Sequence, residues 1–279
     1  MSKKIPKYKF NSNQKIDFEI TSIRAIYEKS KNQLYSPHRQ EFYGLFYFKN
    51  AFGSHFVDFK AYKINIGDIF LISNEQVHYF NNIEKTDGDV LLFTSTFLDN
   101  DVLIDQIFET SVGNPQLSLH EKQYGYFDTL INHIRTIWAS DKHSKSEILK
   151  RYVEILLLEI YQSNQESSLL QDINYQRFLT FKKDLKAYFK DHKKVKYYAD
   201  RQFISSKTLN LATRAIVDKS AKQFINEYIV LLAKRMLINT NNTSSAIAYA
   251  LGFDEPTNFT KFFKRIVSLS PSAFQKTYK

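Results

Sequence analysis

The stretch TSSAIAYALGFDEPTNFTKFFKRIVSLSPSAFQKTY, residues 243–278, has the pattern of two short helices joined by a tight turn. Thr243 or Ser244 can cap the first helix, because a hydroxyl there accepts a hydrogen bond from a free backbone N–H. Gly252 stands where a helix ends in a left-handed residue, and Pro256 suits the first turn of the next helix. The second helix is expected to bury Phe259, Phe262, Phe263 and Ile266 and to turn outward Thr257, Asn258, Thr260, Lys261, Lys264 and Arg265.

This outward face is small, basic and able to form hydrogen bonds, which suits the major groove of DNA. An ordinary helical hairpin with a solvated polar face would have the same spacing. Periodicity alone leaves both interpretations open.

The same stretch resembles the second helix-turn-helix unit of AraC/XylS-type bacterial transcription regulators. The matching segments are Ile247-Ala248, Gly252-Phe253, Phe259 with Phe262-Phe263-Lys264, and Ser270-Pro271-Ser272. Ser268 departs from the pattern, because the family usually has Gly there. The resemblance implies DNA binding by this helix, and the expected contact residues are Thr257, Asn258, Thr260, Lys261 and Lys264.

Residues 198–216 resemble the family's first helix-turn-helix unit. Ser205 is the expected N-cap of its second helix, and the expected outward DNA contacts are Lys207, Asn210 and Arg214. The residues that depart from the family pattern are Phe203, Leu211 and Asp218. We therefore expect this helix to hold phosphates more than to read bases. Residues 224–237 have apolar side chains at helical spacing and are expected to form a rigid helix between the two units.

The net charge of +10 belongs to the C-terminal part of the chain. From Asp172 onward there are 20 Lys and Arg against 8 Asp and Glu, whereas residues 1–171 hold 19 against 21. A basic block beside a near-neutral block suggests a nucleic-acid module joined to another domain. The chain has no Cys, which excludes disulfides and thiolate chemistry. No apolar run has membrane-spanning length and no signal peptide is evident, so we expect a cytoplasmic protein without a membrane partner.

The N-terminal half has short strand-like runs separated by turn residues, a pattern typical of a β-sandwich or barrel. The expected strands are 18–20, 24–27, 41–48, 55–59, 61–64, 69–72, 76–80 and 90–93, with a turn at residues 87–89. Pro37-His38, residues 67–72 and Val77-His78 occur in an order that resembles the cupin-type sensor domain of the same regulators.

The candidate effector-binding residues of this predicted barrel are Tyr43, Phe46, His55 and His78. Metal-dependent cupins carry a His-x-His pair with a following Glu and a second motif with another His. Only the second motif is suggested here, at His78. Because a metal site needs several convergent ligands, we expect no metal, no cofactor and no catalytic residue.

Two amphipathic helices are expected next. One has its apolar seam at Tyr124, Phe127, Ile131, Ile134 and Trp138, and the other spans residues 146–161 and is apolar around most of its circumference. One packing partner does not cover such a helix. We therefore expect a homodimer, which the resemblance also implies, and packing within a monomer is the alternative.

The sequence thus predicts a multidomain α and β protein. The expected domains are a cupin-like jelly-roll β-barrel with two dimerisation helices at 1–163, a linker at 164–173, and an all-α, homeodomain-like domain with two helix-turn-helix units at 174–279. The expected function is that of a sequence-specific, effector-responsive transcription regulator, with promoter DNA, a small-molecule effector and RNA polymerase as partners. Two alternatives remain: a metal-dependent cupin enzyme with a basic helical tail, and a ligand-independent architectural DNA-binding protein.

Overall fold

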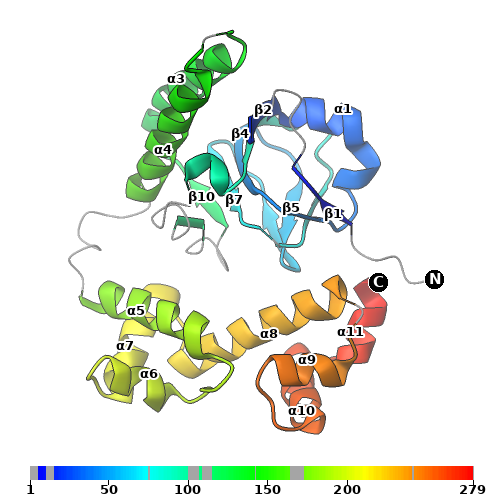
Figure 1. Ribbon diagram of the computed structural model, residues 1–279, viewed down its shortest axis with the longest axis vertical. Helices are drawn as coiled ribbons and strands as arrows, with labels where there is room; N and C mark the ends of the chain where they lie inside the picture. The colour runs from blue at the N-terminus through cyan, green and yellow to red at the C-terminus, as the bar shows by residue number, and fades with distance from the viewer. Residues whose placement is uncertain are drawn as a thin grey trace. The chain divides into compact units, whose positions relative to one another are not determined.

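The computed structural model describes residues 6–10, 16–74, 76–99, 107–108, 115–141, 143–163, 173–240 and 242–278. These residues form two compact units (Figure 1). The N-terminal unit comprises the described residues up to 163, and the C-terminal unit comprises those from 173 onward. Residues 164–172, most of the predicted linker, lie outside the described residues.

The N-terminal unit holds the described strands, arranged in two antiparallel sheets and one short parallel pair. The strands are β1 (Lys7–Tyr8), β2 (Phe18–Ser22), β3 (Arg39–Gln40), β4 (Tyr43–Asn50), β5 (Ser54–Val57), β6 (Lys60–Lys63), β7 (Asp68–Ile72), β8 (His78–Asn81), β9 (Asp87–Phe93) and β10 (Gln116–Ser118). The larger sheet has the order β10-β7-β4-β9-β2, the smaller has the order β6-β5-β8, and β1 pairs with β3. The helices of this unit are α1 (Ile23–Leu34), the 3-10 helix η1 (Thr96–Leu98), α3 (Glu121–Trp138) and α4 (Lys145–Ser163).

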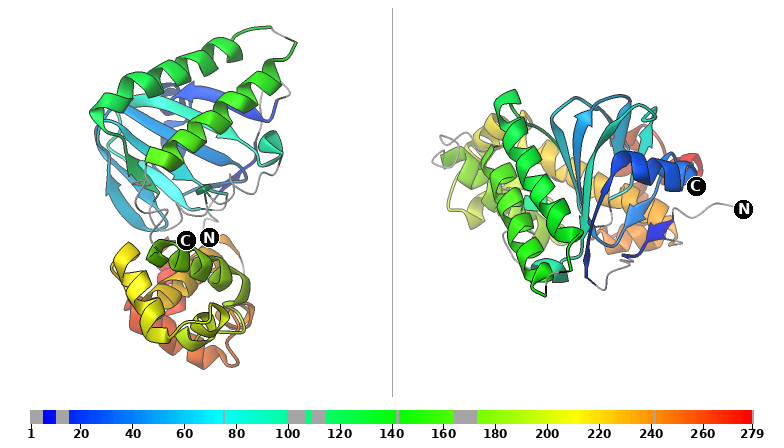
Figure 2. Two further views of the ribbon diagram at one scale, coloured as in Figure 1. Left: turned by 90° about the vertical axis from the view of Figure 1, so that its left-hand side faces the viewer. Right: turned by 90° about the horizontal axis from the view of Figure 1, so that it is seen from above.

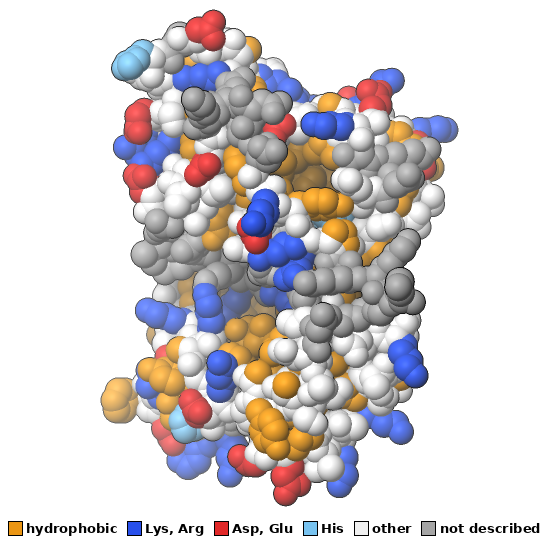
Figure 3. Space-filling view, turned by 45° about the vertical axis from the view of Figure 1, so that its right-hand side comes forward, with side chains coloured by type: hydrophobic (Ala, Val, Ile, Leu, Met, Phe, Trp, Pro, Cys, Tyr) orange, Lys and Arg blue, Asp and Glu red, His pale blue; other side chains and the backbone are white. Residues whose placement is uncertain are grey.

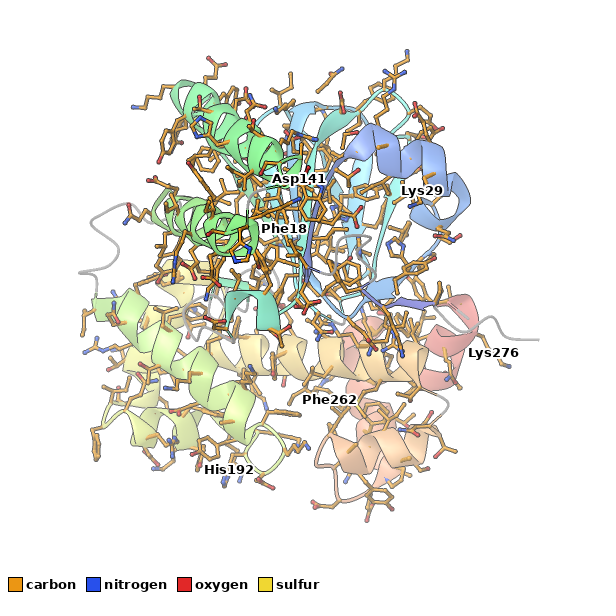
Figure 4. All side chains as sticks on the ribbon, turned by 45° about the horizontal axis from the view of Figure 1, so that its top comes forward. Phe18, Lys29, Asp141, His192, Phe262 and Lys276 are labelled. Atoms are coloured by element: carbon orange, nitrogen blue, oxygen red, sulfur yellow. The ribbon has the colours of Figure 1, made fainter. Side chains whose placement is uncertain are left out.

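Strand β4 lies at the centre of the larger sheet, and both of its faces are buried. Its side chains alternate, so that Leu45 and Tyr47 face one core while Phe46 and Phe48 face another. The first core lies between the sheet and the helices α3 and α4, which lie side by side over this face (Figure 2). Phe18 of β2, labelled in Figure 4, is buried in this core. It packs edge-on against Trp138 of α3.

The second core lies between the opposite face of the larger sheet, the smaller sheet and α1. Phe46 and Phe48 of the larger sheet meet Phe80 of the smaller one at 5.7 and 6.5 Å between ring centroids. Within the larger sheet, Phe48 also packs on Phe70 at 5.6 Å. Burial of these aromatic side chains is the main favourable term that holds the two sheets together.

Two predicted elements of this unit are wrong. Residues 24–27 belong to helix α1, because the Ser22 hydroxyl accepts a hydrogen bond from the Ala25 N–H and thereby caps a helix. Residues 87–89 are the start of β9 and not a turn. Gly88 lies opposite Phe48, and a Cβ there would overlap the Tyr47 carbonyl oxygen, so the glycine allows a close strand contact.

The described part of the C-terminal unit is helical. Its helices are α5 (Ile173–Tyr188), α6 (Val195–Arg201), α7 (Ser206–Val217), α8 (Ala221–Asn239), α9 (Ser244–Ala250), α10 (Pro256–Val267) and α11 (Pro271–Tyr278). We call α6 and α7 the first helix pair, and α9 and α10 the second helix pair. The predicted helix at 224–237 is confirmed as part of α8, which begins at the N-cap Ser220.

Each helix pair packs on its own group of apolar side chains, and Phe253 and Phe262 of the second pair also contact the first group. The first group includes Phe181, Tyr198, Leu209, Ile225 and Ile229, all at most 1% exposed. Around the second pair a chain of ring contacts runs from Phe253 through Phe259 and Phe263 to Phe274 of α11. The two helices expected to contact DNA, α7 and α10, are therefore each held in place by the buried side chains of one face.

Candidate nucleic-acid interface

Helix α7 is the second helix of the first pair, and a local hydrogen bond fixes where it begins. The Ser205 hydroxyl accepts a hydrogen bond from the Thr208 N–H at 3.0 Å, which confirms the predicted N-cap. Leu209, Ala212 and Thr213 are buried, whereas Lys207, Leu211 and Arg214 are exposed. The exposed residues are spaced four and three apart, so they form one strip along the helix.

Asn210 was expected to face outward, and this expectation is wrong. Its Nδ2 donates to the Ser206 carbonyl at 2.9 Å, and its Oδ1 accepts from the Ala221 N–H at 2.9 Å. Ala221 is the first residue of α8, whose N-terminal N–H groups have no partner within the helix. The half-buried Asn210 side chain therefore satisfies one of them and joins α7 to α8.

The turn between α6 and α7 contains Phe203 in place of the glycine expected from the resemblance. Its φ is +54°, in the left-handed region, and its side chain is 97% exposed. The turn is held by backbone hydrogen bonds from Phe203 to Asp200 and from Ile204 to Ala199. These bonds keep the helix-turn-helix geometry although a bulky residue occupies the turn.

Helix α10 begins as the sequence predicts, with Pro256 at its first position after Glu255. The preceding helix, α9, is capped by the Thr243 hydroxyl and ends before Gly252, whose φ is +71°. The exposed residues of α10 are Thr257, Asn258, Lys261, Lys264 and Arg265. Counted from Thr257, the other four lie one, four, seven and eight residues further along the chain. This spacing places them on one face of the helix.

Two threonines of α10 already use their hydroxyl protons within the protein. Thr260 is half-buried and donates to the Pro256 carbonyl at 3.0 Å, so it does not point freely outward as predicted. Thr257 is exposed and donates to the Glu255 carboxylate at 3.1 Å. Asn258, Lys261 and Lys264 are therefore the predicted contact residues of α10 that present side chains freely to solvent.

Positive charge is spread over the face of the C-terminal unit that Figure 3 displays. On α10, the charged residues after Glu255 are Lys261, Lys264 and Arg265. On α7 they are Lys207 and Arg214. Beside the cationic face of α10 lies Phe262, labelled in Figure 4, which packs on Phe253 at 5.3 Å between ring centroids. Both helices thus separate a packed apolar face from a cationic one.

This pair of helix-turn-helix units matches known proteins in sequence. A family model described as a helix-turn-helix domain matches residues 198–277. The chain is similar to the transcriptional activator RhaS of Citrobacter koseri, with 20% identity over 262 residues, 88% of this chain and 90% of RhaS. The chain carries a helix-turn-helix domain of the AraC/XylS type. It therefore regulates transcription, and DNA is a partner of its helix-turn-helix domain.

Two further similarities concern a part of the chain and its fold. The regulator shares 39% identity over 54 residues with the uncharacterized HTH-type transcriptional regulator YisR of Bacillus subtilis, a match that spans 19% of each chain. The crystal structure of ToxT from Vibrio cholerae O395 aligns with 94% of this chain and 98% of ToxT, at a TM-score of 0.45 and 13% identity.

Within the described residues, no helix of the regulator is long and apolar enough to span a membrane.

In the N-terminal unit, three of the four predicted effector-binding residues lie together. Phe46, His55 and His78 are buried in the core between the two sheets. A hydrogen bond of 3.1 Å joins His55 Nε2 and His78 Nδ1, and the Phe46 ring lies 5.5 and 5.9 Å from the two imidazole centroids. The fourth residue, Tyr43, faces the other core, where it packs on Phe108. Its assignment to the same pocket is therefore wrong.

His38 joins this group, although it was not among the predicted effector-binding residues. Its ring centroid lies 4.3 Å from that of His78, and the two residues exchange backbone hydrogen bonds. The Nδ1 of His38 donates to the Ser36 carbonyl, whereas His55 Nδ1 and His78 Nε2 have no partner among the described residues. We call His38, His55 and His78 the histidine cluster. The described residues contain no group of three or more His, Asp or Glu arranged to hold a metal ion.

The histidine cluster should make the N-terminal unit sensitive to acid. Burial lowers the pKa of all three imidazoles, most strongly for His55 and His78, whose pKa the neighbouring imidazoles lower further. For His38, backbone hydrogen bonds partly oppose the effect of burial on its pKa. In the unfolded chain each imidazole titrates near pH 6.5. Below about pH 6.5 the unfolded chain therefore binds more protons than the folded one, and stability is lost as the pH falls. Well above about pH 6.5 the three imidazoles are neutral in both states, and they add no further pH dependence.

Urea unfolding at a series of pH values tests this expectation. The single Trp of the chain, Trp138, lies in the N-terminal unit, so its fluorescence follows that unit. We expect the free energy of unfolding to fall by up to about 1.4 kcal/mol per pH unit for each excess proton bound by the unfolded chain. The substitution His78→Gln should reduce this slope, and His143→Gln, at an exposed position, should leave it unchanged. A flat profile from pH 7.5 to 5.5 would contradict the prediction.

Proposed function

We propose that this regulator binds an asymmetric DNA site sequence-specifically, with α10 reading bases and α7 positioning the protein on the backbone. The observation that carries the proposal is the exposed face of α10, where Asn258 and Lys261 stand one turn apart above a buried row of phenylalanines. An Asn amide can pair with adenine, and a Lys ammonium can reach the guanine acceptors in the major groove.

Helix α7 offers fewer groups for base reading. With the Asn210 amide bound to α8, its exposed strip consists of Lys207, Leu211 and Arg214. The two cations suit phosphates, and the Leu211 side chain, which is 57% exposed, suits contact with a thymine methyl group. This composition supports a positioning role for α7.

The experiment that tests the function is selection of duplexes from a random pool by the full-length chain. We expect enrichment of an asymmetric site in which two adjacent major-groove segments, about 34 Å apart, are protected on one side of the duplex. Enrichment of no sequence would overturn the proposal in favour of an architectural DNA-binding protein. The selected duplex is the probe for the variants described below.

We further propose that the N-terminal unit is a cupin-like jelly roll that senses a small molecule and that it is not an enzyme. The antiparallel sheets packed face to face support the fold. The relatives of this chain are transcriptional activators, which favours a regulatory role for the unit over catalysis. A metabolite that binds the native protein should raise the melting temperature in a concentration-dependent way. Stoichiometric metal in the purified chain would instead favour the metal-dependent alternative.

The helices α3 and α4 are the proposed dimer surface. Tyr126, Ile155 and Leu158 are between 37% and 47% exposed, and Ile155 and Leu158 lie one turn apart on α4. A second copy of the chain would cover the same patch on both protomers by two-fold symmetry. The proposed domain limits are 1–163 for this unit, 164–173 for the linker and 174–279 for the DNA-binding domain.

A charge placed in this patch should abolish the dimer. We expect the wild-type chain to sediment as a dimer at micromolar concentration and the double substitution Ile155→Lys and Leu158→Lys to sediment as a monomer. A lysine at these positions must be buried without a partner in the dimer, which costs several kcal/mol. The control is Ile66→Lys, which changes an isoleucine that is 55% exposed outside these helices and should leave the dimer intact. A monomeric wild-type chain would refute the proposal.

A further inference from the structure

The loop between α5 and α6 is a junction at which the two helix pairs meet. Lys193, in this loop, donates from its Nζ to the Lys190 carbonyl at 2.7 Å and to the Gly252 carbonyl. Gly252 is in the turn of the second helix pair. The ammonium also lies 5.0 Å from the ring centroid of Phe253, within reach of a cation–π interaction. One side chain therefore joins the α5–α6 loop, which leads into the first helix pair, to the turn of the second pair.

The backbone of the two segments is in direct contact at the same place. A Cβ on Gly252 would overlap the carbonyl group of Lys190, so only glycine permits this approach. Phe253 and Phe262 of the second pair also pack against the core of the first pair. The contact therefore combines a backbone approach, apolar packing and the hydrogen bonds of Lys193.

A second lysine ties α8 to the junction. Lys222, in the first turn of α8, donates from its Nζ to the Lys193 carbonyl at 3.0 Å. Lys193 and Lys222 thus link α8, the α5–α6 loop and the α9–α10 turn in a continuous chain of hydrogen bonds. Because α8 also connects the two pairs along its length, the pairs are joined at two separate places.

Partial burial of the Lys193 ammonium costs desolvation free energy, and its hydrogen bonds to the two carbonyls offset this cost. Burial lowers the pKa of the Lys193 amine, and the neighbouring charge of Lys222 lowers it further, while Asp254 and Asp191 oppose this change. No carboxylate among the described residues forms an ion pair with Lys193 at this junction. An apolar side chain would fill the same space without the cost of desolvating a charge. What lysine adds is a donor that binds two carbonyls on separate segments.

We propose that Lys193 fixes the angle between α7 and α10 and thereby sets the spacing of the two DNA segments that this regulator accepts. The proposal rests on the function proposed above, in which both helices enter the major groove. Inserting one base pair between the segments moves the second by about 3.4 Å and rotates it by roughly 34°. A rigid junction cannot follow this displacement, whereas a junction held by α8 and apolar packing without the hydrogen bonds of Lys193 can bend.

The test compares duplexes with altered spacing. Starting from the duplex selected by the full-length wild-type chain, one base pair is inserted between the two protected segments. We expect the wild type to lose about tenfold or more in affinity on insertion and Lys193→Met to lose about threefold or less. Lys193→Arg keeps the donors and should restore most of the wild-type penalty. Lys194→Met removes the same charge at the neighbouring exposed position and should keep the full penalty.

A spectroscopic measurement makes the test independent of DNA binding. Because the chain has no Cys, spin labels can be placed at Ala187→Cys on α5 and Ser245→Cys on α9, both exposed. The distribution of distances between the two labels should be narrow in the labelled chain with Lys193 and in its Lys194→Met variant. It should be broader in the Lys193→Met variant.

The outcomes separate the two proposals. A Lys193→Met chain with the wild-type spacing penalty and a narrow distance distribution would overturn the role of Lys193. A wild-type chain that selects no sequence would overturn the proposed function, and the distance distributions would still decide whether Lys193 makes the junction rigid.

Discussion

Replacing Phe259 by alanine should lower the free energy of unfolding of the C-terminal unit by about 3–5 kcal/mol. The Phe259 side chain is fully buried, with ring contacts of 5.5 Å to Phe253 and 5.8 Å to Phe263. Its removal loses the transfer free energy of an aromatic ring and leaves a cavity in the row that supports α10. We expect the second helix pair to lose its packing first.

The chain offers a matched control for this substitution. Phe203→Ala makes the same chemical change at a side chain that is 97% exposed, and the expected effect on stability is within about 0.5 kcal/mol. The measurement is urea unfolding followed by far-ultraviolet circular dichroism, which detects the helical C-terminal unit, alongside the fluorescence of Trp138, which reports the N-terminal unit. Equal losses for the two variants would show that α10 is not held by this core.

The second helix pair was predicted from sequence because its signals are local. The Thr243 hydroxyl, Gly252 and Pro256 each act on backbone within a few residues, so their effects do not depend on the rest of the fold. The Ser205 cap of α7 follows the same rule. Helix α1 was missed because its aliphatic residues also suit a strand, and only the capping hydroxyl of Ser22 distinguishes the two.

Thr260 was misplaced for a local reason, because its hydroxyl binds the Pro256 carbonyl one turn back. The other errors in the candidate sites come from longer-range packing, with one exception. Asn210 turns inward because α8 presents an unpaired N–H to it, and His38 meets His55 and His78 only through the pairing of distant strand segments. The exception is Tyr43, whose separation of three residues from Phe46 already places the two on opposite faces of a regular strand. Lys193 carried no sequence signal, because its partners are backbone carbonyls.

The substitutions Asn258→Ala and Lys261→Ala should each cost about 1–3 kcal/mol on the selected duplex, about 5- to 150-fold in affinity, and little on a scrambled one. Both side chains are exposed on the face of α10 opposite its buried phenylalanines. Each would lose a hydrogen bond that only the correct base offers. The loss should therefore appear as reduced discrimination between the two duplexes.

Lys207→Ala on α7 should behave differently, because its proposed partner is a phosphate. We expect weaker binding to both duplexes and a salt dependence reduced by about one in the slope of log affinity against log salt. Lys276→Ala, at an exposed lysine of α11 outside both helix pairs (Figure 4), controls for the loss of charge alone and should have a smaller effect. The measurement is binding of the full-length variants to both duplexes across a salt series. If Asn258→Ala and Lys261→Ala weakened binding to the two duplexes equally, α10 would be a backbone-binding helix and the sequence would have to be read elsewhere.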